Sequence, residues 1–214
     1  MPITILARVL MLLSLATPAM QTPGKPGDLF AELYTRGVTR QKTLKSIGAS
    51  FTETTVSTLL VKPIVARGTI VAAPPARVRM VYVDPEPKTV TMDGRTLIVD
   101  WPKRGDRERV DIREVQKRVD QYFTNAGIDD LRKLFDITAQ ADPASRRTDR
   151  IEMIPKRKQI KQGIEKLELW IDRESDLLTE MRMSFPGGDR KTIVLTDLKE
   201  NVPVTDDLFV APKP

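Results

Sequence analysis

The spacing of apolar and polar residues changes along the chain, and each change predicts a different element. Between residues 28 and 46, apolar side chains begin at Leu29, Phe30 and Leu33 with helical spacing, and Asp28 stands where an N-cap is expected. This segment is therefore predicted to form an amphipathic helix. From Phe51 onward the residues are rich in β-branched types, which indicates strands.

Strands follow one another at short intervals, and proline or a turn sequence ends each of them. They are predicted over residues 51–61, 66–73, 76–83, 88–92 and 95–99, and again over roughly 135–141, 149–154, 164–172, 177–185 and 190–197. Within 76–83, Val78, Met80 and Tyr82 alternate with Arg77 and Arg79, so one face of the strand is apolar and the other polar. Such short connections favour an antiparallel meander.

The stretch DPEPKTVTMDGRTLIVDWP, residues 84–102, carries the strongest local signal. Asp93-Gly94 between two β-rich runs predicts a hairpin with these two residues as its loop. In that register Val90 faces Leu97, one face of the hairpin is apolar, and the other is mostly threonine. Asp93 is therefore interpreted as a turn residue and not as a catalytic acid.

Residues 103–135 interrupt the strands and are predicted to form a helical insert. An antiparallel sheet of this length curls, and its apolar concave face needs a cover, so this insert and the first helix are expected to supply one. The fold class expected is α+β, mainly β. A helix of this kind either buries its apolar stripe permanently or acts as a lid that lifts, and the sequence leaves both open. The predicted lid residues are Val115, Val119, Tyr122, Phe123, Leu131 and Leu134.

The first twenty residues have a different character from the rest. Arg8 precedes the apolar run from Val9 to Ala16, and small residues follow. The run is shorter than the ~20 apolar residues that span a bilayer, so a cleaved secretory signal over residues 1–20 is favoured over a membrane anchor. A flexible leader over 21–27 and one domain over 28–214 complete the predicted organisation. This implies export to the periplasm.

Composition removes several classes of function. The sequence contains no cysteine and no histidine, so disulfides, the commonest general base and the commonest metal ligand are all absent. No phosphate-binding loop accompanies the carboxylates, and we expect no catalytic residue, metal or cofactor. The net charge of +6 lacks an aromatic-interleaved basic patch, so nucleic acid is not expected as a partner. The basic turn at 155–163 is either a solvated loop or a docking patch for anionic headgroups.

The hairpin block and the end of the chain together resemble a known family, the LolA-type lipoprotein carrier proteins. The resemblance rests on Pro75, Arg79, Tyr82, Pro85, Asp93-Gly94 and Pro102 in the block, and on Asn201, Phe209 and Pro212 near the end. It implies an unclosed antiparallel β-barrel with helices as a lid, and a periplasmic shuttle that binds the acyl chains of lipoproteins. Members of that family carry a basic residue before the first proline of the block, which helps to hold the lid closed. Ala73 or Pro74 occupies that position here, so the latch has no counterpart.

The resemblance implies that the inner faces of the strands bind lipid. Methionine suits a lining that accepts variable chains, although each one is equally readily an ordinary core residue. The expected partners are a lipid or acylated lipoprotein cargo, with an inner-membrane donor and an outer-membrane acceptor as transient contacts, and a monomer is expected. The alternative is a periplasmic sensor or regulator on the same fold that binds a partner protein; similar regulators carry a second domain, for which no sequence follows Pro214. The predicted lipid-binding residues are Phe51, Ile70, Val78, Met80, Tyr82, Val90, Met92, Leu97, Val99, Leu167, Leu169, Met181, Met183 and Phe185.

Overall fold

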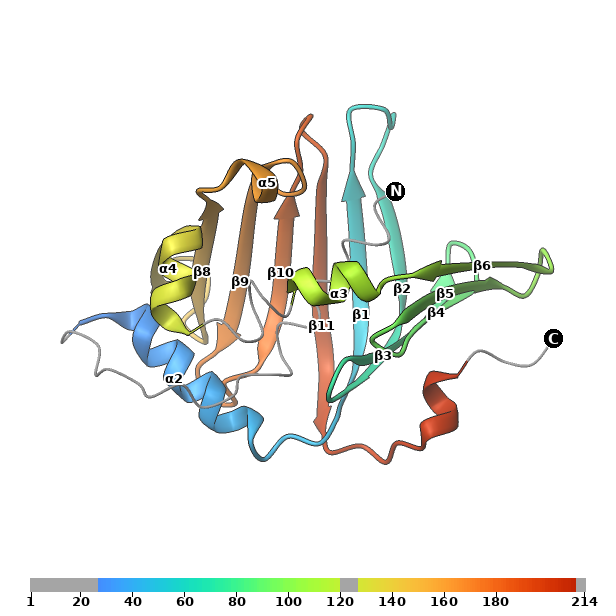
Figure 1. Ribbon diagram of the computed structural model, residues 1–214, viewed down its shortest axis with the longest axis horizontal. Helices are drawn as coiled ribbons and strands as arrows, with labels where there is room; N and C mark the ends of the chain where they lie inside the picture. The colour runs from blue at the N-terminus through green and yellow to red at the C-terminus, as the bar shows by residue number, and fades with distance from the viewer. Residues whose placement is uncertain (1–26, 120–126, 211–214) are drawn as a thin grey trace.

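The protein, described by a computed structural model over residues 27–119 and 127–210, forms one antiparallel sheet of eleven strands with most of its helices on one side (Figure 1). The strands are β1 (Ile47–Val56), β2 (Ile64–Ala73), β3 (Arg77–Asp84), β4 (Lys88–Met92), β5 (Thr96–Trp101), β6 (Asp106–Asp111), β7 (Phe135–Ala141), β8 (Thr148–Pro155), β9 (Lys166–Asp172), β10 (Leu178–Ser184) and β11 (Arg190–Glu200). The helices are α2 (Leu29–Gln41), α3 (Arg113–Val119), α4 (Ile128–Leu134), α5 (Lys158–Lys161) and the 3₁₀ turn η3 (Asp206–Phe209).

The strand order explains why the sheet stays open. It runs β6-β5-β4-β3-β2-β1-β11-β10-β9-β8-β7, so every neighbour is consecutive in sequence except β1 and β11. Strands β6 and β7 follow one another along the chain yet lie at opposite edges. The connection between them must cross the open side of the curled sheet, and α3 and α4 lie in that connection (Figure 1). The predicted mainly-β fold, an unclosed antiparallel barrel with helices, is confirmed.

The first helix is shorter than predicted. Asp28 is its N-cap, as expected, and accepts a hydrogen bond from the backbone N–H of Ala31 at 3.1 Å. The helix ends at Gln41 and not near residue 46, because the chain beyond it bonds to the C-terminal segment. The Ser46 hydroxyl donates to the carbonyl of Val202 at 2.6 Å, and β1 begins one residue later.

The predicted helical insert of residues 103–135 begins instead with a strand. Residues 106–111 read DRERVD and have no apolar periodicity, so no local pattern identifies them as a strand. They form β6 because they pair with β5, for example Leu97 with Val110 and Val99 with Glu108. Nearly all of β6 is exposed and charged, which is how natural proteins protect an edge strand from pairing further.

The β4–β5 hairpin differs from its predicted register by two residues. Val90 pairs with Val99 and not with Leu97, and Gly94, at φ +85°, is the first central residue of the turn. Asp93 stands before the turn, where its carboxylate accepts hydrogen bonds from the N–H groups of Arg95 at 2.8 Å and Thr96 at 2.6 Å. A shift of two residues preserves the side-chain alternation, so the apolar face is the predicted one.

The outer, convex face of β8–β10 carries charge where the inner face is apolar. Glu168 is buried on that side, within 4.0 Å of Arg150, Lys166 and Arg182. The ring of Trp170 lies between Arg150 and Arg182, at 5.8 and 4.8 Å from its centre. The outer face of these strands is therefore polar and faces water, and the inner face is the apolar side of the sheet.

Candidate functional site

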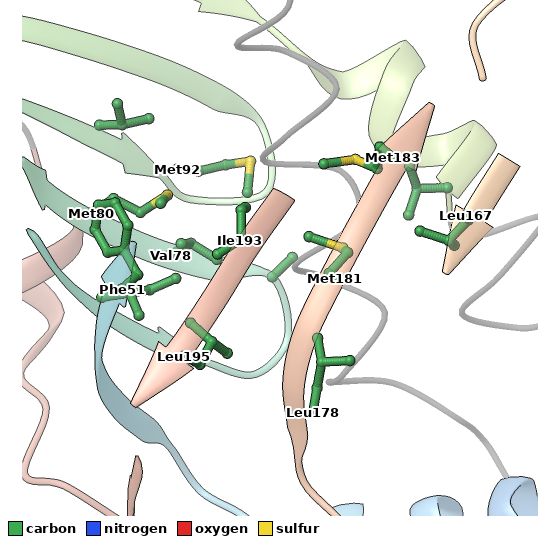
Figure 2. Close-up of a cluster of buried hydrophobic side chains, with 14 of the residues drawn as sticks. Phe51, Val78, Met80, Met92, Leu167, Leu178, Met181, Met183, Ile193 and Leu195 are labelled. Atoms are coloured by element: carbon green, nitrogen blue, oxygen red, sulfur yellow. The ribbon is translucent and has the colours of Figure 1, made fainter. Parts of the chain in front are cut away.

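The inner face of the curled sheet, meaning the side that the helices cover, is lined largely by apolar side chains. Figure 2 shows methionines of β3, β4 and β10 gathered with Phe51 and Leu167 in one cluster. Unbranched methionine side chains rearrange more readily than branched ones, so they suit a lining that has to change shape. Five methionines, each exposed by 4% or less, face this side: Met80, Met92, Met153, Met181 and Met183.

The predicted lipid-binding residues all lie in this cluster or against it. Twelve of the fourteen are buried, whereas Leu169 and Phe185 are half-buried and pack against its margin. Register explains the grouping, since Leu169 pairs with Met181 and Leu167 with Met183 on the same side of β9 and β10. The geometry brings the predicted set together; that it binds lipid remains a prediction.

Sequence reasoning did not assign the inward-facing residues of two predicted strands, β8 and β11, to the site. The buried residues there are Ile151 and Met153 on β8, and Ile193 and Leu195 on β11. In each strand an apolar residue also points outward, Ile154 on β8 and Val194 on β11. The alternation of apolar and polar residues that marks an inner face is therefore not visible in these two sequences. The pairing of Phe51 with Leu195 and of Leu167 with Met153 is what assigns the faces.

Polar side chains interrupt the apolar lining at one point. Glu53 and Lys191 face inward from β1 and β11, are nearly buried, and form an ion pair with Nζ 2.8 Å from Oε1. The hydroxyl of Tyr82 donates to the other carboxylate oxygen of Glu53 at 2.9 Å. Burial raises the pKa of Tyr82, and the neighbouring carboxylate raises it further, so the phenol stays protonated as a donor. We call Glu53, Lys191, Tyr82 and Lys88 the polar cluster.

Lys88 completes the polar cluster from β4. Its Nζ lies 4.5 Å from the centre of the Tyr82 ring, a cation–π contact. Burial lowers the pKa of Lys88, and although Glu53 acts in the opposite direction, Lys191 lowers the pKa further. The cluster therefore places two ammonium groups, one carboxylate and one hydroxyl near one end of the inner face.

The predicted lid residues that the structure describes pack toward the inner face. Val119 on α3 and Leu131 and Leu134 on α4 are buried, Val115 is half-buried, and Tyr122 and Phe123 lie outside the described residues. Helices α2 and α4 both pack against β7, whereas the described part of α3 makes sparse contacts with other elements. Among the described residues, the cover is therefore joined to the edge of the sheet chiefly through α2, α4 and β7.

An ion pair joins the two anchored helices. Arg132 of α4 bonds to the carboxylate of Asp28, the N-cap of α2, and its guanidinium lies 5.7 Å from the centre of the Phe30 ring. The Arg132 guanidinium and the backbone N–H of Ala31 hold the pKa of Asp28 below its usual value. This pair clamps α2 to α4 at the edge of the sheet.

Arg77 and Arg79, the basic residues nearest to the expected latch position, point to the outer face. Arg77 pairs with Asp206 at 2.6 Å and lies over the ring of Phe209, and Arg79 donates to the carbonyl of Leu208. Both arginines thus hold η3 against the outside of β3, away from the helical cover.

Within residues 27–119 and 127–210, aspartate and glutamate side chains do not gather in any group of three or more that is suited to hold a metal ion. No helix in those ranges has the length and apolar character needed to cross a bilayer.

Comparison with known proteins agrees with the fold. The model of the family described as outer membrane lipoprotein carrier protein LolA matches residues 42–212. No curated protein matches the sequence significantly. Among solved structures, the lipoprotein LppX of Mycobacterium tuberculosis is similar at a TM-score of 0.54 and 17% identity, over 85% of this chain and 99% of that one.

Two further structures share the fold. An uncharacterised conserved protein from Thermus thermophilus is similar at a TM-score of 0.53 and 12% identity, over 86% of this chain and 95% of that one. MucB is similar at a TM-score of 0.53 and 14% identity, over 89% of this chain and 65% of that one. The chain thus spans less than two thirds of the length of MucB.

Proposed function

The chain belongs to the LolA family of outer membrane lipoprotein carrier proteins, and from that premise we propose that it carries a lipid or an acylated lipoprotein, with the acyl chain bound against the inner face of the sheet. The observation that carries the proposal is the inner face itself, which gathers five buried methionines on a sheet whose edges do not meet. A carrier of this kind needs no catalytic group.

The energetics of chain burial suit a carrier. Each methylene group removed from water contributes roughly 0.8 kcal/mol, so about twelve methylenes contribute on the order of 10 kcal/mol before the costs of binding are subtracted. The lining of the inner face is buried, and part of that gain must therefore displace the cover. Helix α3 is the element proposed to move, because among the described residues α2 and α4 pack closely against β7 whereas α3 has no such close strand neighbour.

The polar cluster gives the bound molecule a direction. Its ion pair and hydroxyl stand at one end of a lining that is otherwise mostly apolar, so the polar end of an amphiphile finds hydrogen-bonding partners there. The acyl chain then extends toward the methionines of β10, past Met181 and Met183. A lipid phosphate or carboxylate is favoured over a neutral head, because Lys88 adds a second ammonium group.

The two tryptophans of the chain provide a test. Trp101 shares the inner side of β5 with Leu97 and Val99, whereas Trp170 lies on the outer face between two arginines. Bromine atoms on an acyl chain quench tryptophan fluorescence at short range. A brominated fatty acid is therefore expected to quench Trp101 and to leave Trp170 unaffected.

Matched single-tryptophan variants separate the two faces. Trp170→Phe, which retains Trp101, is expected to show saturable quenching, and Trp101→Phe, which retains Trp170, none. Equal quenching of both variants would indicate non-specific association with the surface. Absence of quenching in both would contradict the proposed carrier.

Export belongs to the same proposal. Residues 1–20 have the pattern of a secretory signal, and a carrier between membranes has to work in the periplasm. Transient exchange with an inner-membrane donor and an outer-membrane acceptor follows from such a role. Sequencing the N-terminus of the protein from a periplasmic extract tests this part, because export predicts a new N-terminus near residue 21.

One observation favours a second function, the binding of a partner protein by a sensor or regulator on this fold. Strand β6 is an exposed edge, and a pocket of about 250 Å³ beside it is lined by Arg95, Arg109 and Arg113 together with Thr96 and Asp111. An acidic segment of a partner protein fits the three arginines of this pocket by charge. Amide hydrogen exchange in the presence of an acidic peptide tests it, since docking predicts slower exchange in β6.

A further inference from the structure

The tip of the β1–β2 hairpin exposes large apolar side chains to water. Leu59 is 91% exposed and Val61 107%, and Ile64 at the start of β2 is 46% exposed. Large apolar side chains are usually buried in the protein interior. Several of them exposed together at one protruding tip indicate a surface that contacts an apolar partner. The tip is ordered locally, with the N–H of Leu60 bonded to the carbonyl of Ser57 at 3.1 Å.

Other connections emerge at the same end of the sheet. The antiparallel register places the β1–β2 hairpin, the β10–β11 turn and the β8–β9 connection with α5 at one rim, which lies at the top of Figure 1. The hairpin and the β10–β11 turn are neighbours, because a Cβ atom on Gly188 would stand 3.6 Å from the methyl group of Thr58. We call these three connections the rim.

The rim also carries basic side chains, one beside the apolar tip and the others in the β8–β9 connection. Lys62 follows Val61 directly, and the β8–β9 connection adds Arg157, Lys158 and Lys161, all of them exposed. Among the described residues, none of these four side chains forms a salt bridge, so their charges face solvent. Exposed apolar side chains and positive charges therefore occur together along one edge of the molecule.

We propose that this rim docks the protein onto the surface of an anionic lipid bilayer, with Leu59 and Val61 inserted among the headgroups and the lysines and arginine of the β8–β9 connection over lipid phosphates. Interfacial binding strengthens with the buried apolar area and with attraction to anionic lipid. The polar cluster lies near the same end, since Glu53 and Lys191 precede and follow the connections of the rim. Docking thus turns that end of the inner face toward the membrane. The docking surface stands independently of the proposed cargo.

Vesicle co-sedimentation tests the docking surface. The protein is expected to bind vesicles of phosphatidylglycerol and phosphatidylethanolamine, and to bind vesicles of phosphatidylcholine at least about tenfold more weakly. Two double variants, Leu59→Ser with Val61→Ser and Lys158→Glu with Lys161→Glu, are each expected to weaken binding to the anionic vesicles by about tenfold or more. All four positions are on the surface, so the fold is preserved, and circular dichroism checks this.

Matched controls come from the opposite end of the sheet. Val210 is 61% exposed beyond η3, and Val210→Ser removes an apolar side chain without touching the rim. Arg146→Glu with Lys199→Glu reverses two exposed charges in the β7–β8 loop and near the end of β11. Both controls are expected to bind anionic vesicles like the unaltered protein.

Three results would overturn the docking surface: no binding to anionic vesicles, equal binding to phosphatidylcholine, or equal losses in the rim and control variants. Quenching of Trp101 by a brominated fatty acid is measured on the same variants and is expected to be unchanged. Loss of vesicle binding with intact quenching therefore distinguishes failure of docking from failure of the carrier.

Discussion

At the scale of single residues, the inner face combines an apolar lining with a buried ion pair, and the two are energetically different. Removing one partner of such a pair leaves an uncompensated charge out of water, whereas removing both leaves none. Glu53 and Lys191 are nearly buried and bonded at 2.8 Å, so this distinction applies to them. The fold therefore depends on keeping both partners or removing both.

We predict that Lys191→Met lowers the free energy of unfolding by about 3–5 kcal/mol, because Glu53 then stays buried without its cation. The double variant with Glu53→Gln is expected to recover most of that loss, and urea titration followed by circular dichroism measures both. A double variant as unstable as the single one would show that the lysine acts through packing and not through charge.

Gly68 is a second residue on which the lining depends. It pairs with Phe51 on one side and Tyr82 on the other, and those two rings meet edge to face at 4.9 Å. A Cβ atom at position 68 would lie 2.0 Å from the carbonyl oxygen of Val81 and 2.9 Å from the Phe51 ring. The glycine therefore provides the space in which the aromatic pair sits.

We predict that Gly68→Ala lowers the free energy of unfolding by about 1–3 kcal/mol, since the added methyl group must displace backbone or ring. Thermal unfolding measures the loss. Gly37→Ala is the matched control, because a Cβ atom there meets nothing within 4 Å. Gly37 lies inside α2, so alanine is expected to be neutral or stabilising there. Equal effects of the two substitutions would contradict the assigned role of Gly68.

At the scale of elements, the ion pair between Asp28 and Arg132 ties the first helix to the cover. The pKa of Asp28 lies below its ordinary 3.8 in the folded protein, chiefly through the hydrogen bond from Arg132. A lowered carboxyl pKa stabilises the folded state above about pH 4, and that contribution is lost as the pH falls through the folded value. The clamp between α2 and α4 should therefore loosen in acid.

We predict faster amide hydrogen exchange in α2 and α4 at about pH 3 than at about pH 6, after correction for the intrinsic rates. Arg132→Gln is expected to raise exchange at the higher pH and to remove most of the pH dependence, while the N-cap bond of Asp28 remains. Lys133→Gln is the control, because Lys133 pairs with Asp130 within α4 itself. If the Arg132 variant exchanges its amide hydrogens at the same rates as the unaltered protein, packing against β7 and not the ion pair holds the two helices in place.

Sequence patterns predicted elements well where local chemistry decides them. Alternation located β3, β4, β9 and β10 and their apolar faces, and Asp93-Gly94 located the hairpin. The register of this hairpin was predicted wrongly, because Asp93 precedes the turn and accepts hydrogen bonds from the backbone of Arg95 and Thr96. The sequence Asp-Gly alone does not reveal that role. Strand β6 was not predicted, because its residues have no intrinsic preference for a strand and form one only by pairing with β5.

At the scale of the whole molecule, one non-local pairing sets the shape. Strand β1 pairs with β11, which places β6 and β7 at the two edges and directs the connection between them across the open side. No local pattern in the sequence specifies that pairing. A cover over the concave face was nonetheless predictable, because an apolar face of that size cannot remain in water.

If the protein is a carrier, its covered inner face opens to hold an acyl chain. Native mass spectrometry of the protein, purified from the periplasm of a Gram-negative host and then incubated with a long-chain phospholipid, tests this opening. One bound amphiphile per chain is expected, retained from the host or acquired on incubation. A protein that carries no added mass before or after incubation would contradict it.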